Sequence, residues 1–242
     1  RAAMREAERV ITISEYVKSF IIKQFPEVAE RVFMLPSAVD GSLFFIKEKN
    51  EKLIKKFSLA GKPVILSLAR LSTNEHKGQD RVLKALPYVL KAVPHAMYLI
   101  VGGGKDERID ALLSEQSDLK AHVILVGPVP DDARIDYYNL GDVYVLPSKF
   151  EGFGIVFIEA LACGAPVIAS DGYGCREGLL NGELGLLVNP DDPQSIAGAI
   201  VKILDKKVNP NLLDKKWVRE RSLAVYGINA WNERVARFIK SL

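Results

Sequence analysis

The sequence predicts an α/β protein with a doubly wound parallel sheet. Short, continuous apolar segments rich in Val, Ile and Leu recur along the chain, and amphipathic segments long enough to form helices separate them. Strands that are covered on both faces have this continuous apolar pattern, and strands that alternate with helices form parallel sheets through right-handed crossovers. With 48% hydrophobic residues among 242, the chain has enough apolar material for such a core.

Six segments are expected to form strands of this sheet: residues 64–69, 96–101, 123–126, 143–146, 167–169 and the shorter 185–188. Apolar residues recur at helical spacing between them, which predicts helices over residues 79–92, 108–119, 133–140, 155–162 and 194–204. Asp192 followed by Pro193 marks the start of the last of these helices.

The two ends of the chain have a different pattern. Residues 10–13 and 32–35 are expected to form short strands, with a helix between them that Ser14 caps and that reaches Phe25. Pro36 ends the second strand, and residues 37–41 are expected to form a loop. Residues 217–225 and 230–242 are predicted to form two amphipathic helices at the carboxyl end.

Composition restricts the class of function. Basic residues number 33 and acidic residues 30, so the net charge of +3 permits a phosphate-bearing ligand, and no dense Lys/Arg block predicts nucleic-acid binding. No apolar run approaches the ~20 residues that span a bilayer, and the amino-terminal sequence is not that of a signal peptide. We therefore expect a cytoplasmic protein, with peripheral contact at the inner face of the membrane left open. Two cysteines, Cys163 and Cys175, are expected to be reduced thiols.

The segment from Glu151 to Glu159 is the main functional clue. It follows a predicted buried strand and leads into a predicted helix, and in a doubly wound sheet ligands bind at the carboxyl ends of the strands. Gly152 and Gly154 allow a ligand to approach the backbone, and the free N–H groups of the helix beginning near Ile155 attract an anion such as a diphosphate. Glu151 is expected to face the ligand, and Glu159, about one turn into the helix, to reach back toward ribose hydroxyls.

Three other loops after strands hold candidate ligand contacts. Arg70 ends one strand and Lys77 begins the next helix, which suits a leaving diphosphate, although two exposed loop cations would have the same pattern. The glycine turn with Gly103 and Gly104 is either a ligand contact or a structural turn. The turn at Pro128 and Val129 can form a rigid apolar slot for a flat base, although considered without the other sites a plain turn would be favoured.

Other chemistries lack their motifs. His76, His95 and His122 are scattered without metal-ligand spacing, and helix capping explains the aspartate pairs at 131–132 and 191–192. The sequence contains no nucleophile elbow and no Walker loop. We therefore expect neither a metal nor a cofactor.

Together, these motifs resemble those of a known family. Its central run is Pro147-Ser148-x-x-Glu151-Gly-Phe-Gly-x3-Ile158-Glu159-Ala160-x-Ala162-Cys163-Gly164-x-Pro166-Val167-Ile168-Ala169. This run resembles the E-x7-E signature of the retaining GT-B glycosyltransferases (glycosyl transferases group 1, family four), which include sucrose- and glycogen-synthase-like enzymes. Residues 68–71 with Lys77-Gly78 resemble the family's diphosphate clamp, residues 185–193 resemble its domain-closing segment, and Trp231 resembles the tryptophan of its last helix.

The resemblance implies a Rossmann-like domain, the carboxyl-terminal half of a GT-B fold, and a role for each matching residue. Arg70, Lys77, Gly154 and Ile155 would bind the donor diphosphate. Glu151, as the catalytic residue, would hold the donor sugar with Phe153 and Gly154, Glu159 would hold the ribose, and Pro128 and Val129 the base. The substrate would be a nucleoside-diphosphate sugar, used without a cofactor or metal and with retention of configuration.

The chain departs from the family pattern in two details and in extent. Ala69 replaces the usual glycine, and Ser37-Ala38 replaces the common Asn-Gly before Val39-Asp40. Residues 1–35 resemble only a remnant of the amino-terminal acceptor domain and linker, residues 36–225 the donor domain, and residues 226–242 a helix that crosses back. The chain also begins without Met, so we expect a piece of a longer enzyme, poorly active alone, whose carbohydrate or lipid-linked acceptor is unknown.

Two other interpretations stay open. In the first, the chain is a non-catalytic nucleotide-sugar-binding module or fragment that needs a partner domain. This interpretation predicts an apolar, self-associating face. An epimerase of the same fold would also use UDP-sugars, but it would need catalytic carboxylates in the missing half, and the E-x7-E pair argues against it.

Overall fold

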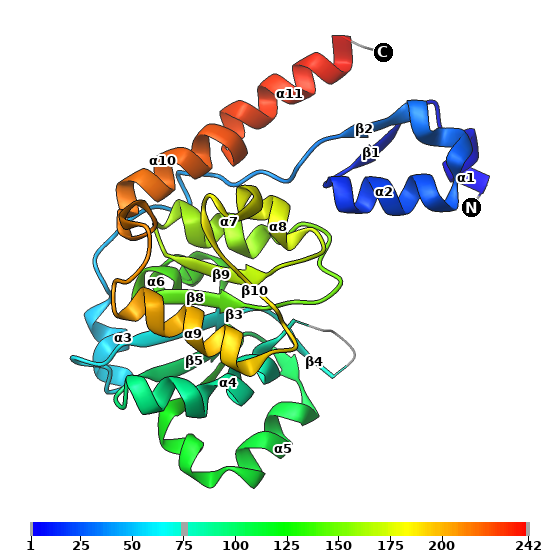
Figure 1. The fold of residues 1–242 in the computed structure, drawn as a ribbon. Coiled ribbons are helices and arrows are strands. Elements are labelled where there is room, and N and C mark those ends of the chain that lie inside the picture. Colours follow the sequence, from blue (N-terminus) through cyan, green and yellow to red (C-terminus); the bar gives the residue numbers. More distant parts are fainter. Residues whose placement is uncertain (1, 74–76, 241–242) are drawn as a thin grey trace.

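The computed structural model describes residues 2–73 and 77–240, and its centre is a six-stranded sheet (Figure 1). The spatial order is β10-β9-β8-β3-β5-β7, and every neighbouring pair is parallel. The bounds are β3 Val64–Leu68, β5 Met97–Val101, β7 Val123–Gly127, β8 Val143–Leu146, β9 Val167–Ser170 and β10 Gly185–Val188. The six predicted strands and the doubly wound α/β class are therefore confirmed.

Helices cover both faces of this sheet. One apolar core lies between the sheet and α4 Gln79–Ala92, α5 Glu107–Glu115 and α9 Pro193–Leu204. The other lies against α3 Glu51–Lys56, α6 Arg134–Leu140, α7 Ile155–Ala162, α8 Cys175–Gly178 and α10 Lys215–Tyr226. Ile65 and Leu66 of β3 belong to opposite cores because successive strand residues face opposite ways. Within the described residues no helix combines the length and apolarity needed to cross a bilayer.

The predicted helices differ from the structure mainly at their ends. Helices α4 and α7 have the predicted bounds, and Asp192 caps α9 by accepting from the backbone N–H of Gln194. The helix predicted over residues 108–119 instead ends at Glu115, and a 3-10 helix, η2 Ser117–His122, follows. Only Ile109 of α5 is buried, so little packing supports a longer helix there. Helix α3 was not predicted from the sequence, although the Asn50 side chain caps it.

The amino-terminal residues form a separate two-stranded parallel sheet, β1 Val10–Thr12 with β2 Val32–Met34 (Figure 1). Around it lie α1 Ala2–Glu6, α2 Glu15–Gln24 and the 3-10 helix η1 Pro26–Arg31. Ser14 caps α2 as predicted, since its side chain accepts from the backbone N–H of Val17.

The last helix, α11 Ile228–Lys240, extends toward this small sheet (Figure 1). The ring of Phe238 lies 4.6 Å from that of Phe33 in β2. Residues 241–242 of the predicted last helix lie outside the described part of the chain. The three-part division at residues 35 and 225 stays a prediction.

The two thiols provide a first test of the fold. Cys163 and Cys175 are unpaired and buried, and burial raises the pKa of Cys163 to about 12 and that of Cys175 to about 11. Because the thiolate is the reactive form, we expect neither thiol to react with iodoacetamide at neutral pH in the folded protein and both to react in denaturant. Mass spectrometry of the labelled protein measures this, and rapid labelling of the native protein would contradict the packing.

Candidate functional site

A cleft of about 720 Å³ lies at the carboxyl ends of β3 and β8. It brings together seven of the predicted site residues from two loops: Arg70, Lys77, Glu151, Gly152, Phe153, Gly154 and Ile155. The first loop follows β3 and the second follows β8, and these two strands pair directly in the sheet. Their parallel direction places both loops at one edge, which is where ligands bind in doubly wound sheets.

A smaller hollow of about 340 Å³ adjoins the cleft. Predicted base contacts Pro128 and Val129 line it together with Gly103 of the glycine turn. Arg70 lines both the hollow and the cleft. Arg70 therefore lies at the boundary between the cleft and the hollow.

Backbone packing fixes the two loops of the cleft against each other. The Ser148 hydroxyl donates to the carbonyl of Lys77 at 2.9 Å, and the Ser170 hydroxyl donates to the carbonyl of Ser148 at 2.5 Å. Gly78 has a φ of +97°, and a Cβ there would lie 2.5 Å from the Pro147 carbonyl oxygen. Only glycine fits this contact. The close packing of Gly78 on Pro147 therefore fixes the position of the neighbouring Lys77 relative to the loop after β8.

The charged groups of the cleft include an ion pair. The Lys77 Nζ atom lies 3.0 Å from Oε2 of Glu151, and the two side chains are 30% and 16% exposed. Helix α7 begins at the same point, with Gly154 as its N-cap residue. The cleft therefore combines cations, one carboxylate and a helix N-terminus, which is suited to an anionic ligand. Residues 74–76 of the first loop lie outside the described part of the chain.

Glu159 lies deeper than a ribose contact requires. It is only 5% exposed, its Oε2 accepts from the Tyr138 hydroxyl at 2.6 Å, and it forms an ion pair with Arg134. Burial raises the pKa of the Glu159 carboxyl, although both bonds favour its charged form. Among the described residues that line the cleft and the hollow, Arg134 is present and Glu159 is not. Direct contact of Glu159 with a ribose stays a prediction. In the structure, Glu159 contacts Arg134, and Arg134 lines the hollow.

The two predicted residues of the glycine turn, Gly103 and Gly104, lie in different surroundings. A Cβ on Gly104, where φ is +100°, would lie 2.1 Å from the Leu71 carbonyl oxygen. This close approach joins β4 Leu71–Ser72 to β6 Gly104–Lys105. The structural interpretation therefore suffices for Gly104, while Gly103 lines the hollow.

Several lining residues were not predicted from the sequence as ligand contacts. Ile13 and Ser37 line the cleft, and Asp131 and Arg134 line the hollow. Lys149 and Phe150 also line the cleft, and they lie in the loop after β8, at the strand end where a ligand was expected. Arg134 had a local signal, because it lies one helical turn before Tyr138 and follows the predicted base turn. Ile13 and Ser37 had none, since more than a hundred positions separate them from the loop after β8.

Two of the three histidines, His95 and His122, lie in the described part of the chain. Nδ1 of His122 lies 3.0 Å from the carbonyl oxygen of Ala96, and His76 lies outside the described residues. Within residues 2–73 and 77–240, no group of three His, Cys, Asp or Glu side chains is placed to hold a metal ion.

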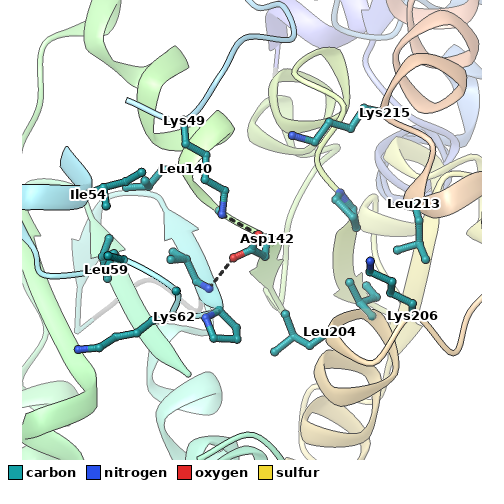
Figure 2. Close-up of a pocket in the computed structure, with 17 residues that line it drawn as sticks. Lys49, Ile54, Leu59, Lys62, Leu140, Asp142, Leu204, Lys206, Leu213 and Lys215 are labelled. Carbon is teal, nitrogen blue, oxygen red and sulfur yellow. Dashed lines mark hydrogen bonds and ion pairs between the residues drawn. The ribbon is translucent and has the colours of Figure 1, made fainter. Parts of the chain in front are cut away.

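A third cavity, of about 520 Å³, lies at the opposite edge of the sheet (Figure 2). Asp142 in this cavity accepts from Nζ of Lys49 at 2.6 Å and from the backbone N–H of Val64, the first residue of β3, at 2.8 Å. The predicted site residues all lie in the described part of the chain, and none of them lines this cavity. Since ligands of doubly wound sheets bind at the carboxyl edge, the cleft and hollow are the candidate site.

Comparison with known proteins identifies the class. A family model described as glycosyl transferases group 1 matches residues 49–220, and the chain belongs to this family. It is 31% identical over 218 residues to a GDP-mannose-dependent alpha-(1-6)-phosphatidylinositol monomannoside mannosyltransferase of Mycolicibacterium smegmatis, a match that covers 84% of this chain and 56% of that protein. It is 28% identical over 217 residues to a D-inositol 3-phosphate glycosyltransferase of Acidothermus cellulolyticus, covering 86% and 48%.

Solved structures agree on the fold. Sucrose-phosphate synthase from Thermosynechococcus elongatus superposes with a TM-score of 0.77 at 28% identity, over 99% of this chain and 59% of that one. Anabaena HepE in complex with UDP and glucose superposes with a TM-score of 0.84 over 99% and 65%, and at 24% identity it supports the fold alone. The domain is therefore the carboxyl-terminal half of a GT-B fold, and the chain spans about half the length of the curated relatives it matches.

Gly154 provides a test of the loop geometry. Its φ is +92°, and a Cβ would lie 2.3 Å from the Phe157 ring. We expect Gly154→Ala to lower the free energy of unfolding by about 1–3 kcal/mol, the usual cost of such strain. Gly198→Ala is the control: Gly198 lies in α9 with nothing within 4 Å, so alanine should stabilise by about 0.5–1 kcal/mol. Urea denaturation measures both, and equal effects would contradict the geometry.

Glu159 provides a pH test. Its pKa is raised in the folded protein, so between the unfolded and folded pKa values the folded state binds more protons. The free energy of unfolding of the wild type, relative to that of Glu159→Gln, should therefore fall as pH rises through this interval. Urea denaturation of both proteins from about pH 4, near the pKa of a free glutamate, to neutral pH measures the difference. A difference that rises with pH would mean that the pKa is lowered instead.

Proposed function

We propose that this chain forms the donor-binding half of a glycosyltransferase that transfers a hexosyl group from a nucleoside-diphosphate sugar to an acceptor hydroxyl. The observation that carries the proposal is the position of Arg70 where the cleft meets the hollow. A diphosphate is the middle part of such a donor, with a base on one side and a sugar on the other. The order of base, diphosphate and sugar matches the order of hollow, junction and cleft.

Each part of the donor has a suitable partner. The flat base would lie in the hollow beside Pro128 and Val129, with Gly103 allowing close approach. The diphosphate would bind the planar guanidinium of Arg70, the ammonium of Lys77 and the backbone N–H groups at Gly154 and Ile155. The ribose would lie toward Arg134, which Glu159 holds in place.

The sugar would lie beside Glu151 and the backbone of Phe153 and Gly154. Glu151 is the residue we propose to contact the reacting sugar, since its carboxylate lines the cleft and pairs with Lys77 at 3.0 Å. The ring of Phe153 packs on Tyr226 at 5.4 Å, so Phe153 would contribute its backbone rather than its ring.

The bond from the anomeric carbon to the diphosphate oxygen would break, and a bond from the acceptor oxygen to that carbon would form. The departing nucleoside diphosphate would keep the electron pair of the broken bond and would take up the proton that the acceptor hydroxyl loses. Arg70 and Lys77 would stabilise the negative charge that develops on the diphosphate. We further propose that configuration at the anomeric carbon is retained and that no metal is needed. The presence of Arg70 and Lys77 in the lining of the cleft supports this proposal, since cations of the chain could take the role of a metal.

The relatives suggest the substrates. The mycobacterial relative is named as GDP-mannose-dependent and acts on a phosphatidylinositol mannoside, and HepE was solved with UDP and glucose. We therefore propose a GDP- or UDP-hexose donor and a glycolipid or carbohydrate acceptor. The chain covers 56% of the mycobacterial relative and 48% of the D-inositol 3-phosphate glycosyltransferase, which supports an additional domain in the whole protein. We propose that this domain binds the acceptor. The relative named for a phosphatidylinositol mannoside suggests that the protein acts at the inner face of a membrane.

Nucleotide binding tests the proposal. Calorimetry of this chain with GDP, UDP and ADP should show binding of at least one, and Arg70→Ala or Lys77→Ala should weaken it about tenfold or more, as expected when a charged hydrogen bond of ~1.5–3 kcal/mol is lost. Lys84→Ala is the matched control, since Lys84 is an exposed lysine of α4 that does not line the cleft. No binding of any of the three by the wild type, or equal binding by all four proteins, would refute the donor site.

A further inference from the structure

The cleft loop is held by two segments that are distant in sequence. The Ser14 hydroxyl donates to the carbonyl of Gly152 at 2.5 Å. The same oxygen accepts from the backbone N–H of Val17 at 3.1 Å, and Ser14 is fully buried. The serine that caps α2 therefore also fixes a backbone carbonyl of the predicted donor loop, 138 positions away.

Glu177, in the short helix α8, also binds the N-terminus of α2. Its Oε2 accepts from the backbone N–H of Glu15 at 2.6 Å and its Oε1 from that of Tyr16 at 2.9 Å. These are N–H groups of the first turn of α2, which have no partner within the helix. A carboxylate at a helix N-terminus is favourable, and here it joins α2 to the segment after β9.

The second segment also contacts the cleft loop directly. The backbone N–H of Gly174 donates to the carbonyl of Glu151 at 2.9 Å, and a Cβ on Gly174 would lie only 2.0 Å from the carbonyl oxygen of Gly152. Residues 13–17, 150–153 and 173–177 therefore form one junction, called here the three-segment junction. Both carbonyls that precede Phe153 accept from donors outside their own loop.

Strained aromatic residues lie at this junction. Phe150 and Tyr173 have φ values of +59° and +54°, a region that bulky side chains rarely adopt. Their rings lie 5.1 Å apart, and the ring of Tyr16 lies 5.6 Å from that of Tyr173. Because such backbone conformations persist only where surrounding contacts hold them, the junction maintains a shape that the loop would not keep alone.

From these contacts we propose that Ser14 and Glu177 are positioning residues of the donor site. They fix the loop from Phe150 to Gly154 before the ligand arrives, and a preordered loop binds more tightly because less conformational freedom is lost. This inference rests on the proposed donor-binding function. It also means that the segment preceding the donor domain shapes the donor pocket.

The test compares Ser14→Ala with Ser19→Ala, since Ser19 is an exposed serine of the same helix. Hydrogen exchange followed by mass spectrometry reports on residues 148–156 without any ligand, and peptides from β3 and β5 report on general stability. In Ser14→Ala, exchange in residues 148–156 should accelerate and nucleotide affinity should fall, each about threefold to tenfold, the range for one lost hydrogen bond. Ser19→Ala should match the wild type, and Ser14→Thr, which keeps the hydroxyl, should restore slow exchange.

The outcomes separate this inference from the proposed function. If the wild type binds no nucleotide, the donor proposal fails, and faster exchange of residues 148–156 in Ser14→Ala still decides whether Ser14 orders the loop. If Ser14→Ala is folded and matches the wild type in loop exchange, the positioning role is wrong, and equal nucleotide affinity would overturn it as well.

A second variant covers the case in which Ser14→Ala does not fold. Glu177→Gln keeps the shape of the side chain but replaces one accepting oxygen with an amide NH2 group, whose nitrogen donates and does not accept, so residues 148–156 should again exchange faster. Glu183→Gln is its control, an exposed carboxylate bonded to Arg221 away from the junction. Unchanged loop exchange in Glu177→Gln would then refute the proposal.

Discussion

The pairing of β3 with β8 at the centre of a parallel sheet is the constraint on which the rest of the site depends. Because the two strands run in the same direction, the loop with Arg70 and Lys77 and the loop with Glu151 emerge at one edge. Contacts as close as that between Gly78 and the Pro147 carbonyl then lock the loops together. The sheet therefore does more than support the cleft: its register sets the distance between the cations and the helix N-terminus.

The two glutamates of the E-x7-E motif have opposite environments although they belong to one short segment. Glu151 lines the cleft, where its partly exposed carboxylate pairs with Lys77. Glu159 is buried, and Arg134 and Tyr138 bind its carboxylate. Glu159 lies one helical turn into α7, where its carboxylate contacts Arg134 and Tyr138 of α6 instead of the cleft. Within one motif, one carboxylate lines the cleft and the other supports a neighbouring cation.

The amino-terminal segment is tied to the donor domain through specific polar contacts rather than through a broad apolar interface alone. Ser14 and Glu177 place the N-terminus of α2 beside the cleft loop, and Phe238 of α11 packs on Phe33 from the other side. These contacts join residues 13–17 to the loop that follows β8, and they join β2 to the last helix of the chain.

The six strands of the central sheet, helices α4 and α7, the Ser14 cap and most of the loop residues that line the cleft could be predicted from the sequence. These features have local signals: apolar periodicity, a capping side chain and glycines after a strand. Three contacts became known from the tertiary structure alone: the ion pair of Glu159 with Arg134, the close approach of Gly104 to the Leu71 carbonyl, and the hydrogen bond from Ser14 to the Gly152 carbonyl. Those partners are 25, 33 and 138 positions apart. A contact at such separation is fixed by how the elements pack, and the residues on either side of it carry no local pattern that predicts it.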